Sequence, residues 1–122
     1  KYKTLGEYPE GTRAARHDPR MHQAELRAES IEVSEKITAH CEQKGVAPSH
    51  FSLAWVLANP IVTSTIVGPR TMEQFKDNIQ CLDVEITAED EAFVDSLVPP
   101  GEHSGKGFQD TQYPIIGRPS AV

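Results

Sequence analysis

The stretch from Ile61 to Asn78, IVTSTIVGPRTMEQFKDN, limits the possible folds of this chain more than any other. Positions 61–67 are valine, isoleucine, threonine and serine, a composition typical of a buried β-strand. Gly68-Pro69 ends this strand, and Thr71 with Gln74 three residues later predicts a capping box that begins a helix. The stretch is therefore predicted to form one strand–turn–helix unit.

Such a unit also predicts an anion site. A strand that enters a capped helix through a glycine brings unpaired backbone N–H groups and the positive end of the helix dipole together, which favours phosphates. Arg70 lies beside this point, and its planar guanidinium suits a phosphate better than a lysine would. The alternative is an ordinary β–α turn with a surface arginine, because every α/β protein contains such turns.

Composition excludes several classes of function. The 122 residues suffice for one domain, and a formal net charge of −6 without a long basic run argues against a nucleic-acid partner. No apolar run approaches the roughly 20 residues that span a bilayer, and no signal peptide opens the chain, so we expect no membrane partner. Cys41 and Cys81 form no CxxC motif, which favours a reduced, cytoplasmic setting.

The first half of the chain is predicted to be a loop followed by helices. Residues 1–17 show no sustained period, and residues 18–60 carry two helices. Asp18-Pro19 should begin a helix that runs to Lys44 and ends at Gly45, and Pro48 should begin a second, largely apolar helix to Ala58. Neither helix offers a convincing metal site, because glutamates such as Glu29 and Glu32 have no histidine at ligand spacing, and His40, Cys41 and His50 lie on separate helices.

The second half ends in a helix and a tail. After the strand, the helix of unit 61–82 should run from Thr71 to about Cys81 and bury Met72, Phe75 and Ile79. Thr87, with Asp90 three residues later, should cap a closing helix over 87–98. Residues 99–122 form a glycine-containing tail with apolar side chains that require cover.

One strand alone presents a contradiction. Its N–H and C=O groups need neighbouring strands, which these residues do not supply. Either another chain or copy completes the sheet, or the sequence is a piece of a larger protein. We favour the piece, and a chain that opens at Lys1 without methionine weakly supports this expectation.

The run LAWVLANPIVTSTIVGPRTMEQFKDN resembles the last βα unit of the aldo-keto reductases. Lys1-Tyr2 resembles the end of their G-x-L-T-G-K-Y segment after the seventh strand, and the helix at Thr87 resembles their closing helix. The resemblance covers nearly the whole chain. It implies an α/β fold, of which residues 1–122 would be the C-terminal portion of a single (β/α)8 TIM barrel domain. The remainder of the barrel would then be the partner of this segment.

The resemblance also implies a cofactor site. Gly68, Pro69, Arg70 and Thr71 would line the 2′-phosphate of NADP(H), with Arg70 as its charge partner. Gln74 and Asn78 would lie along the adenine and ribose, with Asp77 beside Asn78. Many relatives have lysine-serine in place of Gly68-Pro69 and arginine in place of Gln74, which leaves the choice between NADP and NAD open. Gln74 would alternatively cap the N–H of Thr71 and not contact the cofactor.

The catalytic aspartate, tyrosine, lysine and histidine of the family lie in earlier barrel strands, and none can be assigned to a residue of this chain. The implied activity of the parent protein is reduction of an aldehyde or ketone to an alcohol, with a small-molecule carbonyl compound as substrate and hydride from the nicotinamide. The tail would take the place of the C-terminal loop that shapes the substrate pocket. Two alternatives remain: a helical protein-interaction module, and an aldo-keto-reductase-like regulatory subunit without catalysis.

Overall fold

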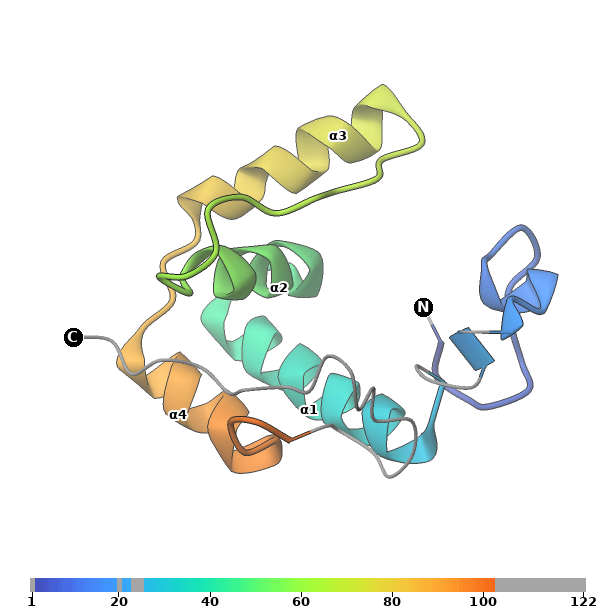
Figure 1. Cartoon of the computed structure of the whole chain (residues 1–122), viewed down its shortest axis with the longest axis horizontal. Coiled ribbons are helices and arrows are strands. Elements are labelled where there is room, and N and C mark those ends of the chain that lie inside the picture. The colour runs from blue at the N-terminus through green and yellow to red at the C-terminus, as the bar shows by residue number, and fades with distance from the viewer. Residues whose placement is uncertain (1, 20, 23–25, 103–122) are drawn as a thin grey trace.

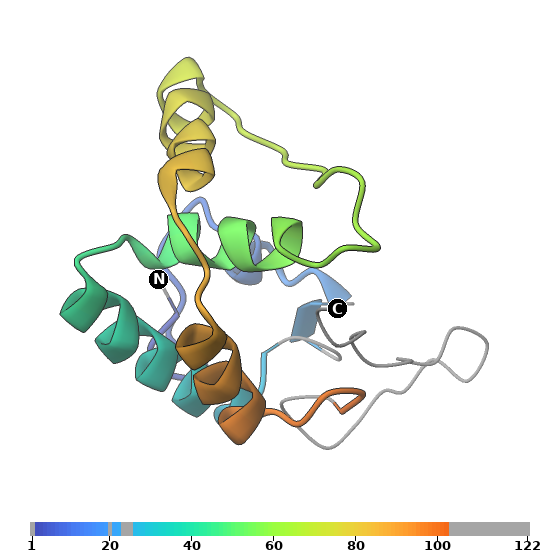
Figure 2. The same ribbon diagram turned by 90° about the vertical axis from the view of Figure 1, so that its left-hand side faces the viewer.

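The computed structural model describes residues 2–19, 21, 22 and 26–102, and within these ranges the chain is helical, with no β-strand. In chain order the elements are η1 (Ala14–Arg16), α1 (Ala28–Lys44), α2 (Pro48–Leu57), α3 (Met72–Ile79), η3 (Gln80–Asp83) and α4 (Ala88–Leu97). Helix α2 lies between α1 on one side and α3 with η3 on the other (Figure 1). Helix α4 lies beside α1 (Figure 2).

Helix α1 is shorter than the sequence predicts. A continuous helix from Pro19 to Lys44 is wrong, because Arg27 has extended backbone angles (φ −133°, ψ 153°) and α1 begins at Ala28. Arg27, the N-cap residue, makes no capping hydrogen bond through its side chain to the described part of the chain. The predicted end is confirmed: Gly45 adopts a left-handed conformation (φ 72°), and its N–H bonds to the carbonyls of Cys41 and Glu42.

Helix α2 follows its prediction within one residue and supplies the centre of the core. Pro48 occupies its first turn, where the missing N–H costs nothing. Phe51 and Ala54 are buried, as are Cys41 of α1 and Cys81 of η3 on either side of α2. Both cysteines are free thiols. The core is therefore small and is centred on α2, where it packs between α1 and η3.

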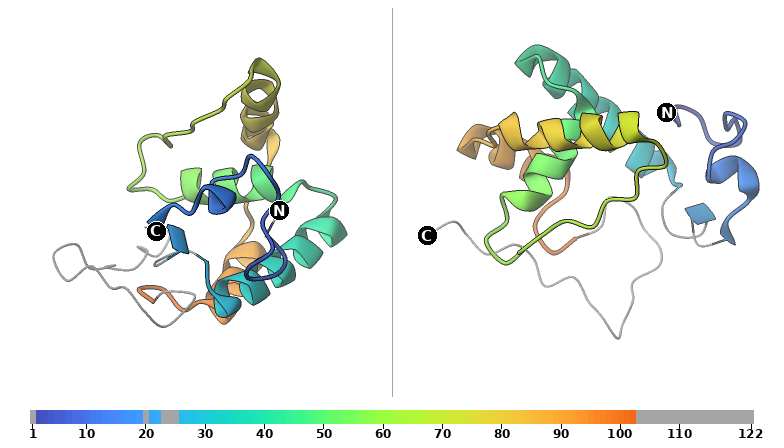
Figure 3. Two further views of the ribbon diagram at one scale, coloured as in Figure 1. Left: turned by 90° about the vertical axis from the view of Figure 1, so that its right-hand side faces the viewer. Right: turned by 90° about the horizontal axis from the view of Figure 1, so that it is seen from above.

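The segment that connects α2 to α3 forms no strand. Residues 64–69 have no regular secondary structure (Figure 3, right), and in the described part of the chain the N–H groups of residues 63–68 have no hydrogen-bond acceptor. The predicted strand at 61–67 is thus not confirmed. The physical reason is that a strand forms only where a neighbouring strand pairs with it, and the described residues supply no such neighbour.

Helices α3 and α4 begin where their caps predict. The burial predicted for α3 is wrong: Met72, Phe75 and Ile79 are 66%, 42% and 46% exposed. Phe75 and Ile79 line a cavity opposite Leu53 and Leu57 of α2 and the connecting segment, so they are only partly covered. Helix α4 has the predicted capping box between Thr87 and Asp90. Of the tail, residues 103–122 lie outside the described residues.

Candidate functional site

The predicted anion site is a turn that leads into α3. Thr71 is the N-cap residue of α3, with extended backbone angles (φ −131°, ψ 158°), and its hydroxyl oxygen accepts a hydrogen bond from the Gln74 N–H at 3.1 Å. This bond satisfies one of the free N–H groups with which every helix begins. The threonine at the end of the Gly-Pro-Arg-Thr sequence therefore fixes where the turn stops and α3 starts.

Gln74 closes the turn from the other side. Its side-chain oxygen Oε1 accepts a hydrogen bond from the Arg70 N–H at 2.8 Å. The predicted bond of Gln74 to the N–H of Thr71 is therefore wrong, because Gln74 caps the N–H of Arg70 instead. The two bonds run in opposite directions across the turn, as in a capping box shifted by one residue.

The groups left available at this turn suit an anion. Within the described residues, the N–H groups of Met72 and Glu73 have no protein acceptor. The Arg70 side chain is exposed, and no carboxylate of the described residues lies within ion-pair distance of it. Glu73, in the first turn of α3, carries the opposing charge. The turn therefore presents one guanidinium and unpaired N–H groups, with one acidic neighbour.

Asp77 faces helix α2 rather than this turn. Its Oδ1 lies 3.0 Å from Nε2 of His50, whose side chain is only 11% exposed. The pair joins α3 to α2 across 27 positions of sequence. A direct contact of Asp77 with a cofactor stays a prediction.

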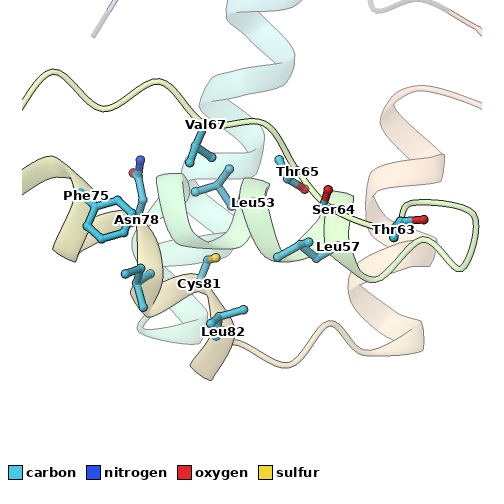
Figure 4. Close-up of a pocket in the computed structure, with 11 residues that line it drawn as sticks. Leu53, Leu57, Thr63, Ser64, Thr65, Val67, Phe75, Asn78, Cys81 and Leu82 are labelled. Atoms are coloured by element: carbon cyan, nitrogen blue, oxygen red, sulfur yellow. The ribbon is translucent and has the colours of Figure 1, made fainter.

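Asn78 lines an apolar cavity of about 230 Å³ between α2, the connecting segment and α3 with η3. Figure 4 shows its amide next to Phe75, on the side of α3 that faces Val67 and Leu53. The half-buried Thr65 also lines the cavity, and its hydroxyl is a buried group without a partner among the described residues. The seven predicted site residues thus form a connected turn at 68–74 and two separate contacts at 77 and 78.

The sequence pattern of the aldo/keto reductase family matches residues 4–99. The chain belongs to the aldo/keto reductase family. Three similar proteins are an uncharacterized oxidoreductase, YrpG, of Bacillus subtilis, a putative voltage-gated potassium channel subunit beta of Schizosaccharomyces pombe and the protein Tas of Escherichia coli. They are 35%, 36% and 42% identical over 75, 64 and 43 residues.

These matches cover 61%, 52% and 35% of this chain but only 23%, 16% and 12% of the respective relatives. A norsolorinic acid reductase of Emericella nidulans is 34% identical over 64 residues. The chain therefore spans about a quarter or less of the length of the family members it matches. The family as a whole is built on a (β/α)8 barrel and comprises oxidoreductases, and the predicted recognition is confirmed.

One cluster of polar side chains was not predicted as such. The Asp90 carboxylate of α4, in a residue that is 2% exposed, accepts hydrogen bonds from Lys44 and His40 of α1. Burial by itself raises the pKa of Asp90, but the hydrogen bonds that its carboxylate accepts, the one from Lys44 foremost, hold this pKa well below its usual range. The sequence shows Asp90 as a cap, whereas its partners on α1 lie 46 and 50 positions away and leave no local signal.

Within the described residues, no three histidine, cysteine, aspartate or glutamate side chains cluster as metal ligands would. Among the helices in this same part of the chain, none has the length and apolar character needed to cross a membrane. Burial, followed by the charge of Asp90, raises the pKa of the Cys41 thiol. Among the described residues, the candidate ligand-binding site of this chain is thus the turn before α3.

Proposed function

We propose that this chain is the C-terminal portion of an aldo-keto reductase barrel and that its turn 68–74 binds the 2′-phosphate of NADP(H). The observation that carries the proposal is the turn itself, in which Arg70 is exposed and the first N–H groups of α3 are unpaired. A helix N-terminus with a free guanidinium attracts a phosphate through both its N–H donors and its charge. The family membership supports the assignment of that phosphate to a nicotinamide cofactor.

The place of the segment in a barrel has support of its own. Ile61 and Ile66 are 69% and 99% exposed, although isoleucine is among the residues most often buried. The N–H groups of residues 63–66 also lack acceptors among the described residues. Both deficits would be removed together if residues 61–67 became a barrel strand with one neighbour on each side and helices behind it.

In this proposal Gly68, Pro69, Arg70 and Thr71 contact the phosphate, and Arg70 supplies the charge. Gln74 acts on the cofactor through the backbone of Arg70, because its side-chain oxygen is already engaged there. Asn78, whose half-buried side chain lines the cavity, would contact the adenosine. Asp77 holds α3 to α2 through His50. None of these residues is catalytic.

The whole protein is proposed to reduce the carbonyl group of an aldehyde or ketone. The nicotinamide would deliver the hydride, and acid–base groups outside this chain would supply the proton. This segment contributes binding energy and orientation at the far end of the cofactor. A cytoplasmic setting is part of the proposal and is supported by the two free, buried cysteines.

A second candidate is a regulatory subunit that binds the cofactor without a catalytic role. The similarity to a putative voltage-gated potassium channel subunit beta favours it. The reductase and the regulatory subunit would both need the phosphate site, and only the reductase would convert a substrate. Oxidation of NADPH in the presence of a panel of aldehydes and ketones separates them, since only the enzyme consumes the cofactor. The helical interaction module is disfavoured, because it accounts neither for the family match nor for the arginine turn.

The phosphate assignment is tested by titrating the whole protein with NADPH and NADH and following nicotinamide fluorescence. Replacing Arg70 by alanine removes a charge-assisted hydrogen bond of about 1.5–3 kcal/mol, which is roughly a tenfold or greater loss of NADPH affinity. NADH lacks the 2′-phosphate, so its affinity should not change. Lys76→Ala is the matched control, because it removes an exposed positive charge two helical positions beyond Gln74. Equal losses for both cofactors would mean that Arg70 supports the turn without reading the phosphate.

A further inference from the structure

A single carboxylate attaches α4 to α1. Oδ1 of Asp90 lies 2.7 Å from Nε2 of His40, and Oδ2 accepts a hydrogen bond from Nζ of Lys44. Nζ of Lys44 also donates to the backbone carbonyl of Glu85 at 2.9 Å, just before α4 begins. Helix α1 therefore grips the N-terminal end of α4 through two side chains one turn apart.

The same carboxylate caps α4. Oδ2 accepts from the Thr87 N–H at 2.8 Å and from the Thr87 hydroxyl at 3.0 Å, and the hydroxyl in turn accepts the Asp90 N–H at 3.2 Å. Three donors from two helices thus meet at one oxygen. The cap that forms the helix and the contact that docks it consequently use the same atom.

Apolar packing contributes little to the attachment of α4. Asp90 is its only buried residue, and no α4 side chain belongs to the buried apolar core of the described residues. The half-buried ring of Phe93 stacks on His40 with 4.3 Å between ring centroids and 12° between ring planes. Since His40 itself bonds to Asp90, even this contact depends on the polar cluster.

We propose that the cluster of Asp90, Lys44, His40 and Thr87 is a charge-dependent latch, whose opening uncaps and undocks α4 as one unit while α1 and α2 stay in place. The proposal is independent of the cofactor site. The titratable groups that face Asp90 are His40, Lys44 and the Cys41 thiol, all from α1, and the Glu85 carbonyl lies beside them. Because hydrogen bonds hold the pKa of Asp90 well below its usual range, the latch is closed at neutral and mildly acidic pH.

The latch makes cap and docking energetically coupled, which a double-mutant cycle measures. Amide hydrogen exchange of α4 is followed in the full chain for wild type, Thr87→Ala, Lys44→Met and the double variant. Each single variant should raise exchange in α4 by roughly tenfold or more, the effect of losing one hydrogen bond to a buried charged group. The rise of α4 exchange in the double variant should be well below the product of the rises in the two single variants. Exchange in α2 should stay within about twofold of wild type.

Lys36→Met is the matched control, because Lys36 lies on α1 and pairs with Glu32 on its exposed face. It should leave α4 exchange unchanged. Multiplicative effects of Thr87→Ala and Lys44→Met, or an equal rise of exchange in α2, would overturn the proposal.

If Lys44→Met prevents folding, the wild-type chain still provides the test. The carboxyl resonance of Asp90 and the exchange of α4 are measured together as pH is lowered. The latch predicts that α4 opens only as Asp90 takes up its proton, so opening while Asp90 is still ionised would overturn it.

Discussion

Replacing Gln74 by alanine should weaken the binding of NADPH more than that of NADH. The substitution removes the acceptor of the Arg70 N–H, a hydrogen bond of 2.8 Å, and leaves Arg70 and the Thr71 cap chemically intact. Helix α3 has eight residues, fewer than the roughly 12–15 at which isolated helices become stable, so its first turn depends on such bonds. Loss of the bond therefore loosens the turn that carries Arg70.

The magnitude follows from the exposure of the bond. Gln74 and Arg70 are both exposed, so water replaces the lost partner and only the net value of a neutral hydrogen bond is at stake, about 0.5–1.5 kcal/mol. This corresponds to a loss of affinity of roughly 2- to 13-fold. The loss should fall mainly on NADPH, because the turn is proposed to hold the 2′-phosphate, which NADH lacks.

The assay is again fluorescence titration, with amide exchange of Arg70 as the structural readout in the absence of cofactor. Gln74→Glu should restore protection of the Arg70 amide, because a carboxylate also accepts this bond, and should weaken NADPH alone through repulsion of its 2′-phosphate. Gln80→Ala, at the C-terminal end of α3, is the matched control and should change neither quantity. Unchanged exchange of the Arg70 amide in Gln74→Ala would refute the reasoning.

Three further predictions concern α4, α3 and the exposed apolar surface. The pKa of Asp90 is lowered in the folded chain, so the stabilisation from its carboxylate is present above about pH 4 and is lost as pH falls through the folded pKa. Acid titration by circular dichroism should show this loss in wild type and a flatter curve in Asp90→Asn. That substitution should lower the free energy of unfolding at neutral pH by about 3–5 kcal/mol. Asp77→Ala removes a partly exposed contact with His50 and should lower stability in thermal melts by no more than about 1 kcal/mol. A fall in cofactor affinity would place Asp77 in the cofactor site, and an unchanged affinity would restrict its role to the contact with α2. The 122-residue chain alone should bind an apolar dye such as ANS and melt with low cooperativity, because side chains such as Ile66 and Leu82 are exposed, and a sharp melt without dye binding would contradict the proposed barrel segment.

Features with local chemistry were predictable from the sequence. Gly45 ends α1, Pro48 begins α2, and Thr71 and Thr87 cap the two later helices, as their neighbours in sequence indicate. Each of these signals acts over three or four residues, which is the range of one helical turn. The start of α1 was mispredicted because Asp18-Pro19 is a good opening signal, yet nothing in the sequence marks the extended residue at Arg27.

Features that depend on distant partners were not predictable. The contact of Asp90 with His40 and Lys44 requires α4 to lie beside α1, and no periodicity specifies that placement. The engagement of Asp77 by His50 has the same cause. The strand at 61–67 fails for the opposite reason, since its sequence favours a strand and its partner strands are missing from the described residues.

The most direct measurement of the central claim compares adenosine 2′,5′-bisphosphate with 5′-AMP by amide NMR of the intact protein. The two ligands differ in the 2′-phosphate alone. The groups proposed to hold it are residues 68–71, with Arg70 as the charge, and the N–H donors of Met72 and Glu73, which have no acceptor among the described residues. We expect the bisphosphate to shift the amide signals of residues 70–73 and to bind roughly tenfold or more tightly than 5′-AMP. Equal affinities, or shifts confined to other parts of the chain, would contradict this expectation.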